Sequence, residues 1–225
     1  MNIAIILSGC GNRDGSELQE TLSLMLAIDR RGWQYQCFAP NGKYTVVSHL
    51  DGSENGEQRD IYTESARIAR GNIRPLADYR PSDYDALALP GGMGAARNLS
   101  TFAFDGSNMT VRPDVEKAIL DTFQLHKPIL AMCIAPMVLA KVLGPYGVRL
   151  TLGQPCPQAD IAQQLGAKVE YCNPTDVCVD RENHVYTTPA YMVASRISEI
   201  FGGAENMVRS FETDVFSPQD CANTL

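Results

Sequence analysis

The stretch Lys127-Pro-Ile-Leu-Ala-Met-Cys-Ile-Ala-Pro-Met-Val-Leu-Ala140 decides the fold. Its first part, residues 128–132, is a short apolar run that predicts a buried strand, and its second part predicts a helix from Ala135. Pro136 suits the first turn of that helix, because the N–H that proline lacks would have had no helical partner there. The chain is therefore expected to turn sharply at Cys133, between the strand and the helix.

Cys133 is flanked by small residues, in the pattern Ala131-x-Cys133-x-Ala135. Small neighbours are needed where a nucleophile is held in strained backbone between a strand and a helix, as in hydrolase-type elbows. A helix N-terminus would also favour the thiolate form of the cysteine. An ordinary core cysteine ahead of a helix fits these residues equally well, so other parts of the chain must decide.

The remainder of the chain alternates predicted strands with predicted helices. Apolar runs predict buried strands at 3–7, 33–39, 84–89 and 185–188, and helices are expected at 63–70, 113–126, 158–165 and from the last strand to about Arg209. This alternation predicts an α/β protein, a three-layer α/β/α sandwich of flavodoxin-like type with a mostly parallel sheet and a nucleophile elbow. Without a linker between two halves, residues 1–225 are expected to form a single domain, with about 210–225 as a tail.

Two segments near the N-terminus carry more specific predictions. Ser16 and Gln19 have the spacing of a capping box, and the helix that follows places Leu18, Leu22 and Met25 on one face. Residues 40–60 interrupt the alternation with two turn signals, Asp51-Gly52 and Asn55-Gly56. We expect this segment to be an excursion outside the main sheet, in the form of a hairpin.

Four strand ends are expected to meet, because parallel sheets bind ligands at the carboxyl ends of their strands. Cys133 follows one strand, and the segments 8–10, 90–92 and 188–189 follow three others. Gly91 and Gly92 could form a plain turn, or could let an N–H point at a developing oxyanion. In the second interpretation Ile134, the residue after the nucleophile, supplies the other N–H donor.

The partner of the thiol is less well defined. Glu17 and Glu20 both lie in the first turns of the first predicted helix, where Glu17 could simply offset the helix dipole and Glu20 could be a surface charge or a proton carrier. The three histidines, at 49, 126 and 184, all fall away from the predicted elbow, which counts against peptidase or amidotransferase chemistry. Cys10 ends the first strand and could pack in the core or act as a resolving thiol.

Composition excludes several classes of protein. A formal net charge of −7 without a basic stripe argues against a nucleic-acid partner, and no apolar run is long enough for a membrane helix. The seven cysteines have no C-x-x-C pair or metal-ligand spacing, so we predict free thiols, no metal site and a reducing, cytoplasmic location without a signal peptide. The glycine-rich loop at 9–15 lacks the nucleotide-binding patterns, so no nucleotide is expected.

Taken together, these motifs resemble the ThiJ/PfpI superfamily, within the class I glutamine amidotransferase-like fold, and in particular its ElbB branch. The resemblance rests on Ile6-Leu-Ser-Gly-Cys-Gly11 with Asp14-Gly-Ser-Glu17, Arg70-Gly-Asn-Ile-Arg-Pro-Leu76, Leu89-Pro-Gly-Gly-Met-Gly94, Ala131-Met-Cys-Ile-Ala-Pro136 and Thr187-Thr-Pro-Ala-Tyr-Met192. These marks extend from residue 3 to about 209.

The resemblance implies a nucleophilic Cys133 with Glu20, rather than Glu17, as its acidic partner. It further implies a cofactor-independent glyoxalase that converts glyoxal or a similar small dicarbonyl to a hydroxy acid such as glycolate, and a homodimer. The alternative is a redox-responsive or protein-handling module, of deglycase or chaperone type, with an oxidisable Cys133 and a link to isoprenoid biosynthesis.

Overall fold

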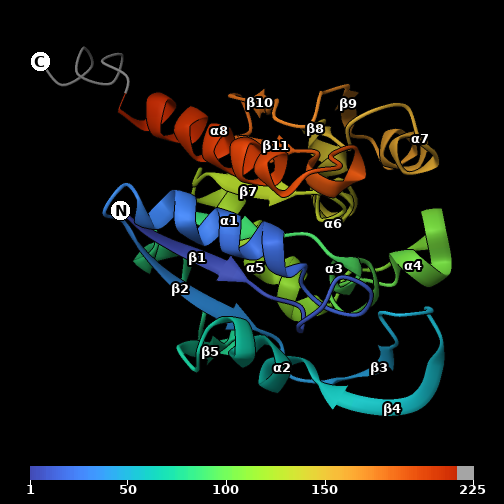
Figure 1. Ribbon diagram of the computed structural model, residues 1–225. Coiled ribbons are helices and arrows are strands. Elements are labelled where there is room, and N and C mark those ends of the chain that lie inside the picture. The colour runs from blue at the N-terminus through green and yellow to red at the C-terminus, as the bar shows by residue number, and fades with distance from the viewer. Residues whose placement is uncertain (217–225) are drawn as a thin grey trace, which may run out of the picture.

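The computed structural model describes residues 1–216 of the chain. Its central sheet contains β1 (Asn2–Ile6), β2 (Gln34–Ala39), β5 (Ile73–Pro75), β6 (Ala86–Leu89), β7 (Ile129–Met132), β10 (Cys178–Asp180) and β11 (Val185–Thr188). These strands lie in the order β10-β11-β7-β6-β1-β2-β5 (Figure 1). Only β10 runs antiparallel to its neighbour, so the prediction of a mostly parallel sheet is confirmed.

Helices cover both faces of this sheet. The helix α1 (Leu18–Asp29) connects β1 to β2, whereas α5 (Pro113–Gln124) leads from β6 to β7, in the opposite direction along the sheet. Because crossovers between parallel strands are right-handed, the two helices lie on opposite faces. The long helix α8 (Ile197–Val215) packs beside α1, and α6 (Pro136–Leu143) packs beside α5 (Figure 1). The predicted three-layer α/β/α sandwich is thereby confirmed.

The remaining helices are short. They are α2 (Ile61–Ile68), α3 (Met93–Arg97), α4 (Phe102–Asp105) and α7 (Pro157–Gln164). Single 3-10 turns occur at Leu76–Asp78, Pro81–Asp83, Gly106–Asn108, Gly144–Tyr146 and Ala190–Met192.

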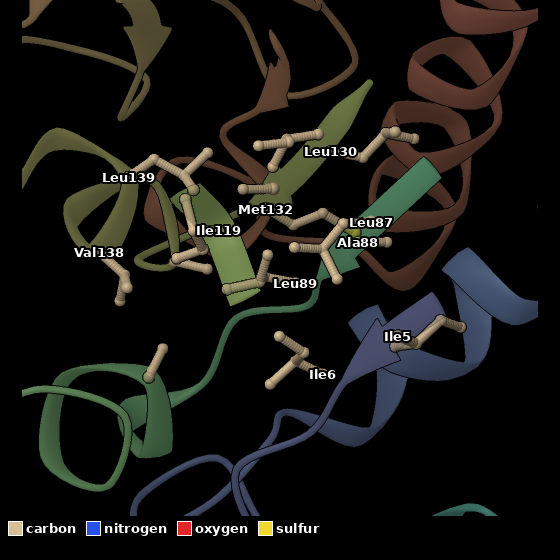
Figure 2. Close-up of a cluster of buried hydrophobic side chains, with 14 of the residues drawn as sticks. Ile5, Ile6, Leu87, Ala88, Leu89, Ile119, Leu130, Met132, Val138 and Leu139 are labelled. Carbon is tan, nitrogen blue, oxygen red and sulfur yellow. The ribbon is translucent and has the colours of Figure 1, made fainter. Parts of the chain in front are cut away.

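The strands in the middle of the sheet are buried on both faces, as their uninterrupted apolar runs predicted. Ile5, Leu87 and Leu130 are each at most 1% exposed and belong to the cluster drawn in Figure 2. Full burial of one such side chain stabilises the fold by roughly 1.5–3 kcal/mol. The same cluster extends through the described part of the chain from Ile3 to Phe211. The prediction of a single domain for residues 1–225 stays a prediction.

Two small sheets lie outside the central one. The strands β3 (Lys43–Val47) and β4 (Glu54–Asp60) pair antiparallel, which confirms the predicted hairpin in residues 40–60. The strands β8 (Arg149–Thr151) and β9 (Lys168–Glu170) form a short parallel pair. Among residues 1–216, no helix is both long and apolar enough to cross a bilayer.

The start of α1 differs from the prediction. Glu17, not Ser16, is the N-cap residue, and its side chain accepts a hydrogen bond from the N–H of Glu20 at 2.6 Å. Ser16 is fully buried and its hydroxyl instead accepts from the N–H of Ser8 at 2.9 Å. The predicted capping box is therefore wrong, because the serine instead closes the loop between β1 and α1.

The apolar face predicted for α1 is also partly wrong. Leu18 and Leu22 are 41% and 52% exposed, whereas Met25, which was placed with them, is buried. Leu24 and Ile28, on the adjacent face of the helix, are instead the residues buried in the core.

The C-terminal helix differs as well, since α8 continues six residues past Arg209 to Val215. Met207, Val208 and Phe211 are buried on it, and this apolar face is what extends the helix. The predicted tail therefore does not begin at 210, and its part from 217 to 225 lies outside the described residues.

Glycines allow the loop after β6 to lie directly on the loop after β1. The N–H groups of Met93 and Gly94 donate to the carbonyls of Asn12 and Gly15 at 2.7 and 2.8 Å. A Cβ added to Gly94 would lie 2.6 Å from the Cα of Gly15 and would also collide with the Ser8 hydroxyl. The close contact of the two loops therefore requires glycine at position 94.

Replacement of Gly94 by alanine is expected to lower the free energy of unfolding by about 1–3 kcal/mol, because the new methyl group meets backbone that cannot move independently. The matched control is Gly202→Ala in α8, where the nearest atom is the end of the Thr175 side chain at 3.1 Å. Urea denaturation of both variants measures the difference. Equal stabilities for the two variants would contradict the tight loop contact.

Candidate functional site

The predicted sharp turn between strand and helix is present at Cys133, while the role of this cysteine as a nucleophile stays a prediction. This residue directly follows β7 and has φ = 59°, a left-handed conformation that non-glycine residues adopt only at some energetic cost. Its N–H donates to the carbonyl of Thr188 at the end of β11, at 3.1 Å, which fixes the turn from the neighbouring strand. Pro136 occupies the first turn of α6, and Ala131 and Ala135 are fully buried beside the elbow, as expected.

Glu20 reaches this elbow from α1. Its side chain is 0% exposed, and Oε1 accepts a hydrogen bond from the N–H of Tyr191 at 3.2 Å. A Cβ added to Gly91 would collide with both the Cβ of Cys133 and Oε2 of Glu20. The carboxyl and the cysteine therefore lie close together, and both fit there only because Gly91 has no side chain.

Burial determines the protonation of this pair. Loss of solvent raises the pKa of Glu20 to about 8, and contacts with Cys133, Tyr191 and Gly91 offset only part of that rise. Burial, followed by the charge of Glu20, raises the pKa of the Cys133 thiol well above its usual range. Because Oε1 of Glu20 accepts from Tyr191, the proton of the neutral acid belongs on Oε2. Near neutral pH both groups are therefore protonated.

Backbone N–H groups partly offset the rise in the pKa of the Cys133 thiol. Hydrogen bonding from the N–H groups of Gly92 and Ile134 lowers the pKa of Cys133 in part. Gly92 has φ = 95°, and a Cβ there would collide with the backbone of residues 15–17. The structure thus brings Gly91, Gly92 and Ile134 to the sulfur, while their role as oxyanion donors stays a prediction.

The two glutamates that sequence reasoning left open have different surroundings. Glu17 caps α1 through the N–H of Glu20, whereas Glu20 contacts the elbow. Burial raises the pKa of Glu17 as well, although three backbone N–H groups, the first of them that of Glu20, counteract this. Of the two glutamates, Glu20 therefore lies beside Cys133 and Glu17 caps the helix, while the role of Glu20 as the acidic partner of the thiol stays a prediction.

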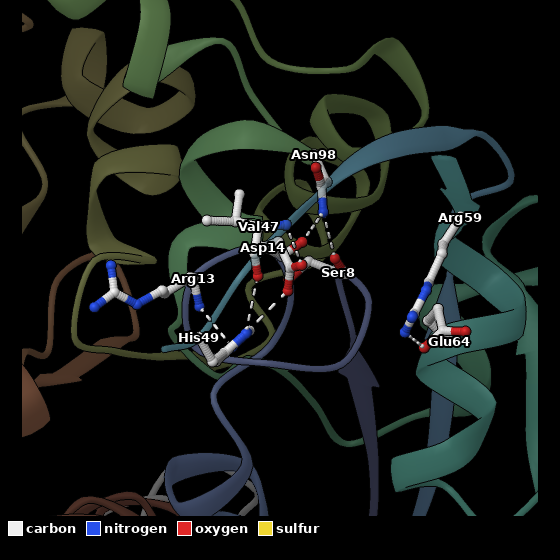
Figure 3. Close-up of polar contacts among 8 residues, drawn as sticks. All are labelled: Ser8, Arg13, Asp14, Val47, His49, Arg59, Glu64 and Asn98. Atoms are coloured by element: carbon white, nitrogen blue, oxygen red, sulfur yellow. Dashed lines mark hydrogen bonds and ion pairs between the residues drawn. The ribbon is translucent and has the colours of Figure 1, made fainter. Parts of the chain in front are cut away.

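Sequence reasoning missed two further parts of the site. One is the N–H of Tyr191, which contacts Glu20 and follows Ala190, itself at φ = 44°. The other is Asn98, whose side-chain amide donates to the carbonyls of Ser8 and Asp14, each at 2.7 Å (Figure 3). The quoted segment Thr187–Met192 contained the first signal, but a backbone donor has no side-chain pattern of its own.

Asp14 continues this network toward the hairpin. Its Oδ2 accepts from the N–H of Val47 at 2.8 Å, and the ring of His49 lies close to the same carboxyl (Figure 3). The N–H of Gly9 donates to the Ser65 hydroxyl at 2.8 Å, which ties the loop to α2. The loop after β1 is thus held by the Ser65 side chain of α2, the Asn98 side chain just after α3 and the backbone N–H of Val47 in β3.

The other candidate groups do not join the thiol. The rings of His126 and His184 lie 6.3 Å apart, before β7 and β11 and so at the opposite end of the sheet from Cys133. Cys10 is a free thiol, and the charges that act on it come from Glu64, Arg67, Asp14 and Arg59, not from the elbow. Within residues 1–216, no three His, Cys, Asp or Glu side chains are grouped as metal ligands would be.

Comparison with known proteins gives relatives over nearly the whole chain. No family model matches the sequence. The human glutamine amidotransferase-like class 1 domain-containing protein 3, mitochondrial, is 40% identical over 218 residues, which cover 92% of this chain and 81% of that protein. The rat ES1 protein homolog, mitochondrial, is 38% identical with the same coverage.

These names contradict the predicted cytoplasmic location, because the curated relatives are mitochondrial proteins. That prediction is wrong. It relied on free thiols, and free thiols require only a reducing compartment, which the cytoplasm is not alone in providing.

Solved structures agree with the fold. An isoprenoid biosynthesis protein with an amidotransferase-like domain from Ehrlichia chaffeensis superposes with a TM-score of 0.88, at 34% identity over 95% of this chain and 99% of that one. A glyoxalase III from Candida albicans superposes with a TM-score of 0.59 at 16% identity, over 94% and 97% of the two chains, and at that identity shares the fold alone. The chain therefore belongs to the family of glutamine amidotransferase-like class 1 domain proteins.

Proposed function

We propose that this protein is a glutathione-independent glyoxalase, which converts glyoxal to glycolate without a cofactor. The observation that carries the proposal is the buried Glu20 carboxyl, with its pKa raised to about 8, directly beside Cys133 at a strained elbow. An acid and a nucleophile that exchange one proton near neutral pH suit carbonyl chemistry.

The first step is addition of sulfur to one aldehyde carbon of glyoxal. Loss of one proton from the coupled pair leaves the Glu20 carboxylate beside the Cys133 thiol, because Glu20 has the lower pKa, and the carboxylate takes the proton of the thiol as sulfur attacks. The sulfur attacks the carbonyl carbon, the carbon–oxygen π bond opens, and the alkoxide takes the proton from Glu20 to give a hemithioacetal. The N–H groups of Gly92 and Ile134 are the donors available for the charge that moves from sulfur to oxygen.

The second step is an internal redox shift. The Glu20 carboxylate removes the proton from the hemithioacetal carbon and returns it to the neighbouring carbon, while the hydroxyl proton of the first carbon moves to the oxygen of the second. One carbon is thereby oxidised to a thioester while the other is reduced to a hydroxymethyl group. Water then hydrolyses the thioester, which releases glycolate and restores the thiol, so that glyoxal and one water account for every atom of the product.

The low solvent exposure of Cys133 supports a small substrate. Cys133 is only 8% exposed and Ile134 only 6%, so a two- or three-carbon dicarbonyl fits the exposed surface better than a peptide does. The absence of a histidine from the described surroundings of the thiol, among residues 1–216, favours proton transfer by Glu20 over triad chemistry.

Cys133→Ala is expected to abolish turnover of glyoxal, and Glu20→Gln to lower kcat by about 10²–10⁴-fold, because the amide cannot carry a proton between the carbons. A steady-state assay of glycolate formation measures both effects. Cys10→Ala, which removes a free thiol away from the elbow, should retain the parent's rate. Parental turnover by Cys133→Ala would overturn the proposal.

The pH dependence of kcat/KM follows from the raised pKa of Glu20. Since the reactive form has lost one proton from the pair, activity should be low in mild acid and rise as the pH passes through about 8. A pH–rate profile with glyoxal tests this, with the residual activity of Glu20→Gln as the comparison. A flat profile between about pH 6 and pH 9 would contradict the assignment of Glu20 as the titrating partner.

A second candidate function is a redox-responsive or protein-handling module. It is favoured by the placement of the Glu20 proton on Oε2, the oxygen beside the cysteine, where it could donate to a sulfinate formed at Cys133. Intact-protein mass spectrometry after mild peroxide distinguishes the two functions. Addition of two oxygens at Cys133, together with negligible dicarbonyl turnover, would favour this module over the glyoxalase.

The homodimer expected from the resemblance also remains a proposal, and an exposed apolar stripe on α1 supports it. Leu18, Leu22 and Leu26 follow one another at intervals of four, so they share a helix face, and they are 41%, 52% and 47% exposed. Burial of such a stripe against its own copy would remove it from water.

Leu22→Asp is therefore expected to convert the dimer to a monomer, because a charge would be buried at the centre of the stripe. Size-exclusion chromatography with light scattering measures the mass. The matched control is Leu125→Asp, which changes a leucine that is 51% exposed at the end of α5. A Leu22→Asp variant that keeps the parent's dimeric mass would exclude this face as the interface.

A further inference from the structure

A cavity separate from the thiol lies between the β3–β4 hairpin and the segment from α3 to the start of α5. It has a volume of about 460 Å³, within the range typical of small-molecule sites. Cys133, Glu20 and Gly92 are not among its lining residues. Figure 1 shows the hairpin and α4 on the same side of the molecule, away from α8. We propose that this cavity binds a small organic anion, a carboxylate or phosphate monoester that carries a planar apolar group.

The charge of the lining indicates an anion. Three cations line the cavity, Lys43, Arg97 and Arg112, and no aspartate or glutamate does, although the protein as a whole has a net charge of −7. Glu54 and Asp114 pair with the two arginines from outside the lining. Lys43 forms no ion pair with any residue between 1 and 216, so its charge remains for a ligand.

Hydrogen-bond donors accompany these charges. Arg112 uses its Nε and one terminal nitrogen on Asp114 and Asn41, which leaves the other terminal nitrogen, beside Gly42, without a hydrogen bond to residues 1–216. The hydroxyl oxygen of Thr101 accepts from the N–H of Thr110 at 2.9 Å. The hydroxyls of Thr101 and Thr110 also lie 3.4 Å apart, so one donates to the other and the remaining hydroxyl proton can turn toward an anion.

The apolar part of the ligand is inferred from Phe104. This side chain lines the cavity, yet it is 63% exposed, and the Arg97 guanidinium lies 5.1 Å from the centre of its ring. A ring held in place by a cation presents a flat surface on which a planar group can stack. An inorganic anion would leave that surface uncovered.

Titration calorimetry on the full chain with phenyl phosphate tests the proposal. The parent should bind phenyl phosphate, and Lys43→Gln and Arg112→Gln should each weaken binding by about fivefold or more, the factor expected for one partly exposed charge contact. Phe104→Ala should weaken phenyl phosphate but not inorganic phosphate. The control is Lys117→Gln, an exposed cation on α5 outside the cavity, which should bind as the parent does.

Three results would overturn the proposal. They are no binding of phenyl phosphate by the parent up to about 10 mM, parental affinity in both Lys43→Gln and Arg112→Gln, and binding of uncharged benzyl alcohol as tight as that of phenyl phosphate. Lys43 is exposed and makes no ion pair with the described residues, so its replacement leaves the fold intact and the test remains decisive.

Discussion

The contact between the Glu20 carboxyl and the Cys133 thiol is the constraint on which the site depends. In water a glutamate would be ionised at neutral pH, but complete burial favours its neutral form by several kcal/mol, as the rise of its pKa to about 8 expresses. Such a rise persists only where water is kept out. The bare backbone at Gly91, the loop contact at Gly94 and the N–H of Tyr191 all bring the surrounding chain close enough to do this.

The same constraint explains why glycine is concentrated at the end of β6. Gly91 leaves space for two side chains, whereas Gly92 and Gly94 leave space for the loop after β1. The first requirement concerns the chemistry of the pair and the second concerns the packing of two loops. One short segment therefore connects the stability of the fold to the protonation of the thiol.

Much of this arrangement could be predicted from the sequence. Uninterrupted apolar runs such as Ile3–Leu7 fixed the position of the buried strands, and the small residues around Cys133 indicated the elbow, because both features act within a few residues of chain. The predictions failed where a distant group competed for a residue. Ser16 has the local pattern of a cap, but Ser8 uses its hydroxyl, and the face of α1 was misassigned because packing against the sheet selected Leu24 rather than Leu22. Asn98 acts across the fold on backbone carbonyls and Tyr191 acts through its own backbone N–H, and local spacing carries no signal for either contact.

The strand order has a consequence for the newly made protein. Strand β7, which leads into the thiol, lies between β6 and β11, and β11 supplies the carbonyl that fixes the Cys133 turn. Residues 134–188, roughly a further quarter of the chain, must therefore leave the ribosome before the elbow can close, since contacts between residues far apart in sequence form late. Until then Cys133 is an ordinary exposed thiol, and Glu20, still distant from it, is an ordinary ionised glutamate. Folding buries the Cys133 thiol and thereby protects it from nonspecific reactions with oxidants and alkylating agents.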